Sequence, residues 1–195
     1  MRIGVNRIRT PLAMNDEEKH VMIKPNIIEL LNAQITHETY AAQLYLQMAM
    51  WCEDRGMHGA ATFFRAHVPE EMIHRDKLVD YMIESGAVVR IEAVPAPRAE
   101  YDDLVEVLQA AYGHEQKVTA QIHKLAEVAL EEKDFSTFNM LQWFISEQRE
   151  EIVLFRGIVE HIKFTGFTGE NGTAMVNMNR YLHRLVLGSA HPELN

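Results

Sequence analysis

The chain has 195 residues, of which 47% are hydrophobic, so it is long enough for one domain with a substantial core. Its net charge of −9 argues against nucleic-acid binding, and its one cysteine, Cys52, excludes disulfides within the chain and Cys-x-x-Cys metal sites, so any metal ligands are oxygen and nitrogen. No stretch approaches the roughly 18 apolar residues of a membrane span, and the first residues lack a secretory signal, so we expect a cytoplasmic protein with no membrane partner.

Apolar residues recur at helical spacing in four long segments, and none of these segments alternates in the manner of a strand. The first predicted helix runs from about 26 to 55 and the second from about 58 to 85, and they end at Gly56 and Gly86. The next stretch, "GAVVRIEAVPAPRAEY", contains two prolines and is too irregular for a helix. We therefore predict a long crossover between the second and third helices.

The third predicted helix spans about 101–130 and the fourth about 136–164. A short fifth helix is predicted near 174–187. Two helical hairpins joined by one long crossover predict an all-α four-helix bundle in which the second and third helices are parallel.

Polar residues interrupt the apolar face of every long helix close to its middle. They are Glu38 in the first helix, Glu71 and His74 in the second, Glu115 in the third, and Gln148 and Glu151 in the fourth. Because the midpoints of equal-length helices meet at one level of a bundle, these groups are expected to converge in one layer of the core. A buried charge without a partner costs several kcal/mol, and no Lys or Arg occupies an inward position. Bound cations are the favoured compensation, with protonation as the alternative.

An oxygen-rich set with one imidazole suits iron, manganese or zinc, and the layout favours two iron ions. Glu71 and His74, three residues apart on one helix face, can hold the first ion together with Glu38. Glu71 can also bridge to a second ion held by Glu115 and Glu151, near Gln148 of the same layer. Incomplete coordination by protein leaves positions for water or dioxygen, as redox chemistry requires.

Several residues around this layer have two interpretations. Tyr45 is either a core tyrosine or an electron donor beside the metals, toward which its ring leans. His67 and His114 are interpreted as structural. Pro69 lies within the second helix just before the ligands, so we predict a kink or a widened turn there. Three acids adjoin the inward residues and are either solvated or part of an accessory metal site: Glu70, Glu147 and Glu150.

Four stretches carry a resemblance to a known family. In "MIKPNIIELLNAQITHETYAAQLYLQMAMWC", "GAATFFRAHVPEEMIHRDKLVDYM", "AYGHEQ" and "STFNMLQWFISEQREEIVLF", over about 140 residues, the chain resembles the bacterial non-haem ferritins. The resemblance implies a ferritin-like bundle with a short fifth helix, assembled into a cage of 24 subunits. It also implies uptake of Fe(II), oxidation by dioxygen or peroxide at a diiron ferroxidase centre inside each subunit, and storage of the ferric mineral.

The resemblance extends to individual residues. It implies that Glu38, Glu71 and His74 bind the first iron, and that Glu71, Glu115 and Glu151 bind the second with Gln148 close by. Tyr45 matches a tyrosine that the family keeps next to the iron pair. A third, accessory ion is implied at Glu70, Glu147 and Glu150, with Glu151 shared. No haem is expected, because "EQREE" lacks the histidine that the haem-carrying relatives have at this place in the fourth helix.

Two other functions stay open at this point. One is a diiron oxidase or peroxidase that does not store iron, and the other is a metal-free structural bundle. The resembling part begins at Met22, so the expected organisation is an N-terminal extension of unknown role at 1–21, the diiron bundle at 22–165, and the fifth helix with a tail at 166–195.

Overall fold

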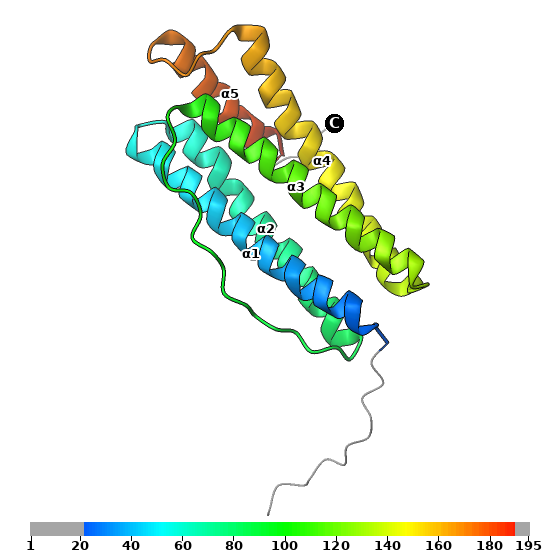
Figure 1. Ribbon diagram of the computed structural model, residues 1–195. Helices are drawn as coiled ribbons and strands as arrows, with labels where there is room; N and C mark the ends of the chain where they lie inside the picture. The colour runs from blue at the N-terminus through cyan, green and yellow to red at the C-terminus, as the bar shows by residue number, and fades with distance from the viewer. Residues whose placement is uncertain (1–21, 190–195) are drawn as a thin grey trace, which may run out of the picture.

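The computed structural model describes residues 22–189, which form five α-helices and no strand (Figure 1). The helices are α1 (Pro25–Asp54), α2 (His58–Glu84), α3 (Leu104–Glu131), α4 (Phe135–Thr165) and α5 (Thr173–Ser189). The predicted all-α class is confirmed, and each predicted helix begins and ends within three residues of the observed one. The predicted extension at 1–21 lies outside the described residues.

Local sequence explains where several helices begin and end. Pro25 opens α1, where its missing N–H costs no hydrogen bond. The Asp103 carboxylate accepts the backbone N–H of Glu106 at 2.8 Å at the start of α3, and Asp134 accepts that of Thr137 at 3.0 Å at the start of α4. Each cap satisfies a backbone N–H of the first turn that has no partner within its helix.

The helices pair as two antiparallel hairpins, α1 with α2 and α3 with α4 (Figure 1). After α2 an irregular crossover runs back along the bundle, so α3 starts at the same end as α2 and runs in the same direction, as predicted. Buried Asn32 of α1 fastens the crossover, because its Oδ1 accepts the N–H of Arg90 at 2.7 Å and its Nδ2 donates to the Val88 carbonyl at 3.5 Å. Among the described residues, no helix combines the length and apolar character needed to cross a membrane.

Buried apolar side chains form two clusters, one toward each end of the bundle. All four long helices contribute to both. The first includes Tyr45, Phe64, Leu108 and Phe155, and the second includes Leu31, Leu78, Ile122 and Phe144. In every long helix the inward polar residues predicted from the sequence fall between the two stretches that supply these clusters. The apolar halves therefore fix the four helices in register around a polar layer.

The fifth helix docks on the beginning of α2. Asn179 Oδ1 accepts the backbone N–H of Ala60 at 2.9 Å, so a side chain of α5 caps the first turn of α2. Gly59 permits this approach, because a Cβ there would lie 2.1 Å from the Asn179 carbonyl oxygen. The ring of Tyr181 stacks on His161 of α4 at 4.0 Å between centroids. Thus α5 is tied to both α2 and α4.

Pro69 does not interrupt α2. The helix continues as an α-helix from His58 to Glu84 with no π-turn, so the predicted widened turn is wrong, while the predicted kink stays a prediction. Both Pro69 and Arg65, whose carbonyl loses its helical partner, are exposed. Water can solvate that carbonyl, so the backbone has no need to rearrange on the buried side.

Candidate metal centre

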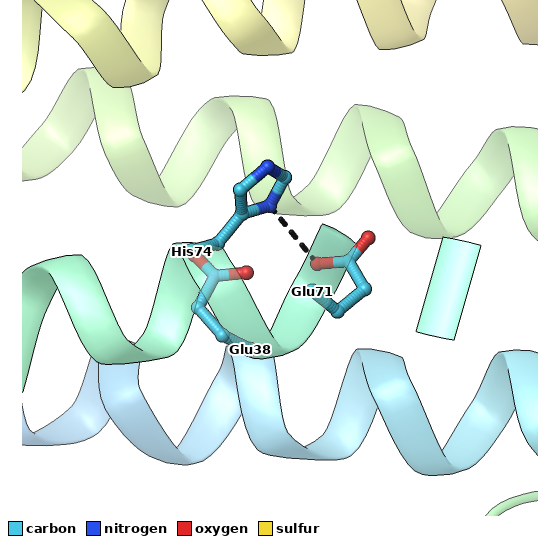
Figure 2. A group of neighbouring side chains, drawn as sticks. All are labelled: Glu38, Glu71 and His74. Carbon is cyan, nitrogen blue, oxygen red and sulfur yellow. Dashed lines mark hydrogen bonds and ion pairs between the residues drawn. The ribbon is translucent and has the colours of Figure 1, made fainter. Parts of the chain in front are cut away.

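One group of three side chains lies in the middle of the polar layer. Glu38 of α1 points toward Glu71 and His74 of α2 (Figure 2). One ligand atom from each of the three lies within 4.8 Å of the others, and the Nδ1 of His74 is 3.2 Å from Glu71 Oε2. Each of the three residues is at most 3% exposed. Two carboxylates and an imidazole thus converge at a point that water barely reaches.

The α3 side of the layer is built around Glu115, which is 1% exposed. The hydroxyl of buried Tyr45 donates a hydrogen bond to Glu115 Oε1. Gln148 of α4 lies alongside, with its Oε1 accepting a hydrogen bond from the Thr119 hydroxyl at 3.0 Å. The Tyr45 ring packs on Phe155 with 5.9 Å between centroids, so the apolar cluster above fixes the position of its hydroxyl.

A second group of possible ligands opens to the surface. His67, Glu70 and Glu151 bring one ligand atom each within 4.8 Å of the others, and His67 Nε2 is 3.9 Å from Glu151 Oε2. These residues line a cleft of about 480 Å³ between α2 and α4, together with Glu147 and Glu150. The end of α5 forms another part of its wall through apolar side chains. Glu151 therefore faces both the cleft and the buried layer.

Residues 28–165 match the family model described as a ferritin-like domain. The chain is 45% identical over 149 residues to the bacterial non-heme ferritin of Escherichia coli O6:H1, an alignment that covers 76% of this chain and 90% of that protein. The chain belongs to the ferritin-like family. To the bacterial non-heme ferritin of Campylobacter jejuni it is 42% identical over 85% of this chain and 98% of the relative.

Solved ferritin structures agree with the sequence comparison. An open-pore ferritin from the archaeon Archaeoglobus fulgidus superposes with a TM-score of 0.79 at 37% identity, covering 84% of this chain and 98% of that one. A form of the same archaeal ferritin engineered to be closed superposes with a TM-score of 0.77, covering 83% of this chain and 96% of that one. The predicted membership of the non-haem ferritins is therefore confirmed at the level of family and fold.

The carboxyl groups of this ferritin-like layer are held in an environment that favours their neutral form. Burial raises the pKa of Glu38 to about 8, and repulsion from Glu71 adds to this rise. The hydrogen bond from Gln34 acts in the opposite direction and lowers the pKa. Burial raises the pKa of Glu151 to about 9, with repulsion from Glu115 next in size. Burial also raises the pKa values of Glu71 and Glu115. A bound cation would reverse these shifts by compensating the negative charge.

Three carboxylate oxygens in this set have no hydrogen-bond partner among the described residues: Oε2 of Glu38, of Glu115 and of Glu151. An unpaired buried acceptor costs about 1–3 kcal/mol. The layer therefore carries unsatisfied acceptors from three different helices, an arrangement suited to binding a cation.

The structure brings together most of the residues proposed from the sequence. The six inward residues lie in one buried layer, and the three adjoining acids line the neighbouring cleft. His67, interpreted as structural, also belongs to the cleft group. The sequence spacing could have indicated that His67 lies beside an acid, because His67 and Glu70 are three residues apart, like Glu71 and His74. His114 belongs to neither group and packs on the Tyr40 ring at 5.7 Å.

Proposed function

We propose that this protein stores iron and oxidises Fe(II) to Fe(III) at a diiron ferroxidase centre in the buried layer of each subunit. Two Fe(II) ions supply the two electrons that reduce dioxygen and two protons to hydrogen peroxide, and peroxide is itself a competent oxidant of further Fe(II). The observation that carries this proposal is the set of unpaired carboxylate oxygens from three helices in a layer that contains one ligating imidazole. Oxygen and imidazole ligands suit iron.

The proposed ligand roles follow the geometry of the layer. Glu38, Glu71 and His74 hold the first Fe(II), and their clustering supports this role. Glu71 also serves the second Fe(II), together with Glu115 and Glu151. Burial raises the pKa of Glu71 and repulsion from Glu115 adds to the rise, which supports a short separation between the two sets of ligands. Gln148 lies beside the second ion and is held by Thr119.

The cleft is the proposed place of a third, accessory ion. Glu70, Glu147 and Glu150 contribute carboxylates there, and Glu151 is shared with the second iron of the layer. We add His67 to this set, because its Nε2 faces Glu151 from the opposite wall at 3.9 Å. An ion at this position would lie between the solvent and the buried pair, on a route by which iron enters or leaves the layer.

Tyr45 is the proposed electron donor beside the irons. Oxidation of a phenol by one electron releases its proton, and the hydrogen bond to Glu115 Oε1 gives that proton an acceptor. The core interpretation holds at the same time, because the ring packs against Phe64 and Phe155.

Storage requires a cage, for which we propose 24 copies of this chain. Large apolar side chains at the surface support association between copies. They include Val88 and Ile91 on the crossover, which are 68% and 77% exposed, and Phe164 at the end of α4, which is 91% exposed. The relative from A. fulgidus occurs as an open-pore ferritin and, after mutagenesis, in a closed form.

The test is to load the metal-free protein with Fe(II) under anaerobic conditions and then admit oxygen. The proposal predicts oxidation much faster than in protein-free buffer, and a soluble ferric mineral in a particle with the mass of a 24-subunit cage. Oxidation at the rate of buffer alone would rule out ferroxidase activity. Fast oxidation by a dimer without mineral would instead identify a diiron oxidase that does not store iron.

A further inference from the structure

One carboxylate oxygen of Glu38 is held by a glutamine of the same helix. Its Oε1 accepts a hydrogen bond from Gln34 Nε2 at 2.8 Å, within one turn of α1, and both residues are buried. Its Oε2 has no hydrogen-bond partner among the described residues and is free to bind a cation. Gln34 therefore fixes the rotation of the carboxylate and decides which oxygen faces Glu71 and His74.

A glutamine can do this only if its own amide is held in one orientation. His37 lies one turn along α1 on the same side, with Nδ1 3.5 Å from Gln34 Oε1. Its other ring nitrogen, Nε2, is 3.4 Å from Nε2 of Gln121 on α3. Both distances are at the long end of the hydrogen-bond range, and together they connect α3 to the ligand on α1.

The donor and acceptor chemistry gives this connection a single direction. The amide nitrogen of Gln121 only donates, so the Nε2 of neutral His37 accepts and its Nδ1 carries the ring proton. That proton is donated to Gln34 Oε1, so the amide nitrogen of Gln34 must face Glu38. Gln121 thus selects the tautomer of His37, and His37 in turn selects the orientation of the Gln34 amide.

We propose that Gln34 and His37 are positioning residues that hold Glu38 Oε2 toward the first Fe(II), with Gln121 of α3 fixing the tautomer of His37. This inference rests on the proposed function, because it assumes a cation between Glu38, Glu71 and His74. Partners that orient a metal ligand from behind typically contribute 10- to 100-fold to metal affinity. His37 lies at the far end of the chain of hydrogen bonds, so an effect of about 10-fold is expected from its loss.

The experiment is an anaerobic titration of the metal-free, assembled protein with Co(II), followed by the visible absorption bands of the bound ion. The band that is lost in Glu38→Gln identifies the first site. His37→Leu is expected to weaken Co(II) binding at that site about 10-fold. His37→Asn is expected to stay within about 3-fold of the unmodified protein, because Asn Nδ2 takes the place of histidine Nδ1 and still donates to Gln34.

His161→Leu is the matched control, since His161 is also half-buried but stacks on Tyr181, away from the layer. It should leave the Co(II) affinity of the first site unchanged. Unchanged affinity in His37→Leu, or an equal loss in His37→Leu and His37→Asn, would overturn the positioning role. Failure of the unmodified protein to bind Co(II) in the layer would instead contradict the proposed function, so the two failures are distinguishable.

Discussion

The buried layer and the cleft contain the same kinds of side chain in opposite surroundings. Glu71 and Glu70 are neighbours in the sequence, yet Glu71 is 2% exposed within the layer while Glu70 is exposed on the wall of the cleft. Water solvates the charges of the cleft. The buried carboxyl groups of the layer can avoid an uncompensated negative charge only by binding a proton or a cation. We therefore predict that the layer depends on metal far more strongly than the cleft does.

The largest expected effect comes from exchanging one glutamate of this neighbouring pair. Glu71→Gln keeps the volume and removes the charge shared by both proposed irons, so the initial rate of Fe(II) oxidation should fall at least about 100-fold. Glu70→Gln should change that rate by less than about 3-fold. Stopped-flow absorbance under oxygen measures both. Equal losses in the two variants would remove the distinction between layer and cleft.

The next effect is the pH dependence of the metal-free protein. The pKa of Glu38 rises from 4.5 to about 8, and that of Glu151 to about 9, chiefly through burial. A raised acid pKa means that the folded state binds the proton more tightly, so its contribution to stability is complete below about pH 4.5 and is lost as the pH rises through 8 to 9. Each group contributes a loss of about 1.4 kcal/mol per pH unit between its ordinary and its raised pKa, so we expect the free energy of unfolding to fall by several kcal/mol between pH 5 and pH 9.

Chemical denaturation across this pH range tests the expectation. Glu38→Gln should flatten the pH dependence, while Glu29→Gln, at an exposed position of the same helix, should not. Binding of a divalent cation at pH 7 should release on the order of two protons per subunit from Glu38 and Glu151, measured in a pH-stat. A stability that rises with pH from 5 to 9 would show that the layer is not protonated in the metal-free protein.

A smaller effect is expected from the cleft itself. The double variant Glu147→Gln with Glu150→Gln should bind one divalent ion fewer per subunit, while its initial oxidation rate stays within about 3-fold of the unmodified protein. Equilibrium titration with Zn(II) counts the ions. Glu160→Gln, an exposed acid further along α4, is the matched control and should bind the full number. Loss of fast oxidation in the double variant would make the cleft part of the oxidising centre.

The smallest effect concerns α5, which supplies part of the wall of the cleft and none of the proposed ligands of the layer. Asn179→Ala removes the cap on α2 and should lower the free energy of unfolding by about 1 kcal/mol. The same change should weaken the accessory ion a few-fold without altering the first two. Asn177→Ala, exposed on the same helix, should alter neither stability nor metal binding. An effect on the buried pair would mean that α5 supports the layer as well.

The sequence was most informative where burial and the helical repeat determine the structure. Apolar spacing predicted the helices to within three residues, and the polar interruptions predicted which residues share the layer, because both depend on a regular helical repeat. The structural interpretation of His67 stays a prediction, and its proximity to Glu151 was not foreseen because it depends on packing between α2 and α4. The predicted widened turn at Pro69 is wrong for a related reason. The energetic effect of the proline on the helix depends on the solvent exposure of the Arg65 carbonyl.

The most direct test of the central claim is anomalous diffraction from crystals loaded with Fe(II) under anaerobic conditions. Our account predicts two iron peaks inside the bundle of each subunit, one among Glu38, Glu71 and His74 and the other beside Glu115 and Glu151. A third, weaker peak is expected in the cleft. Iron confined to the cleft, or no iron in the layer at saturating Fe(II), would contradict the assignment of the buried carboxylates as a diiron centre.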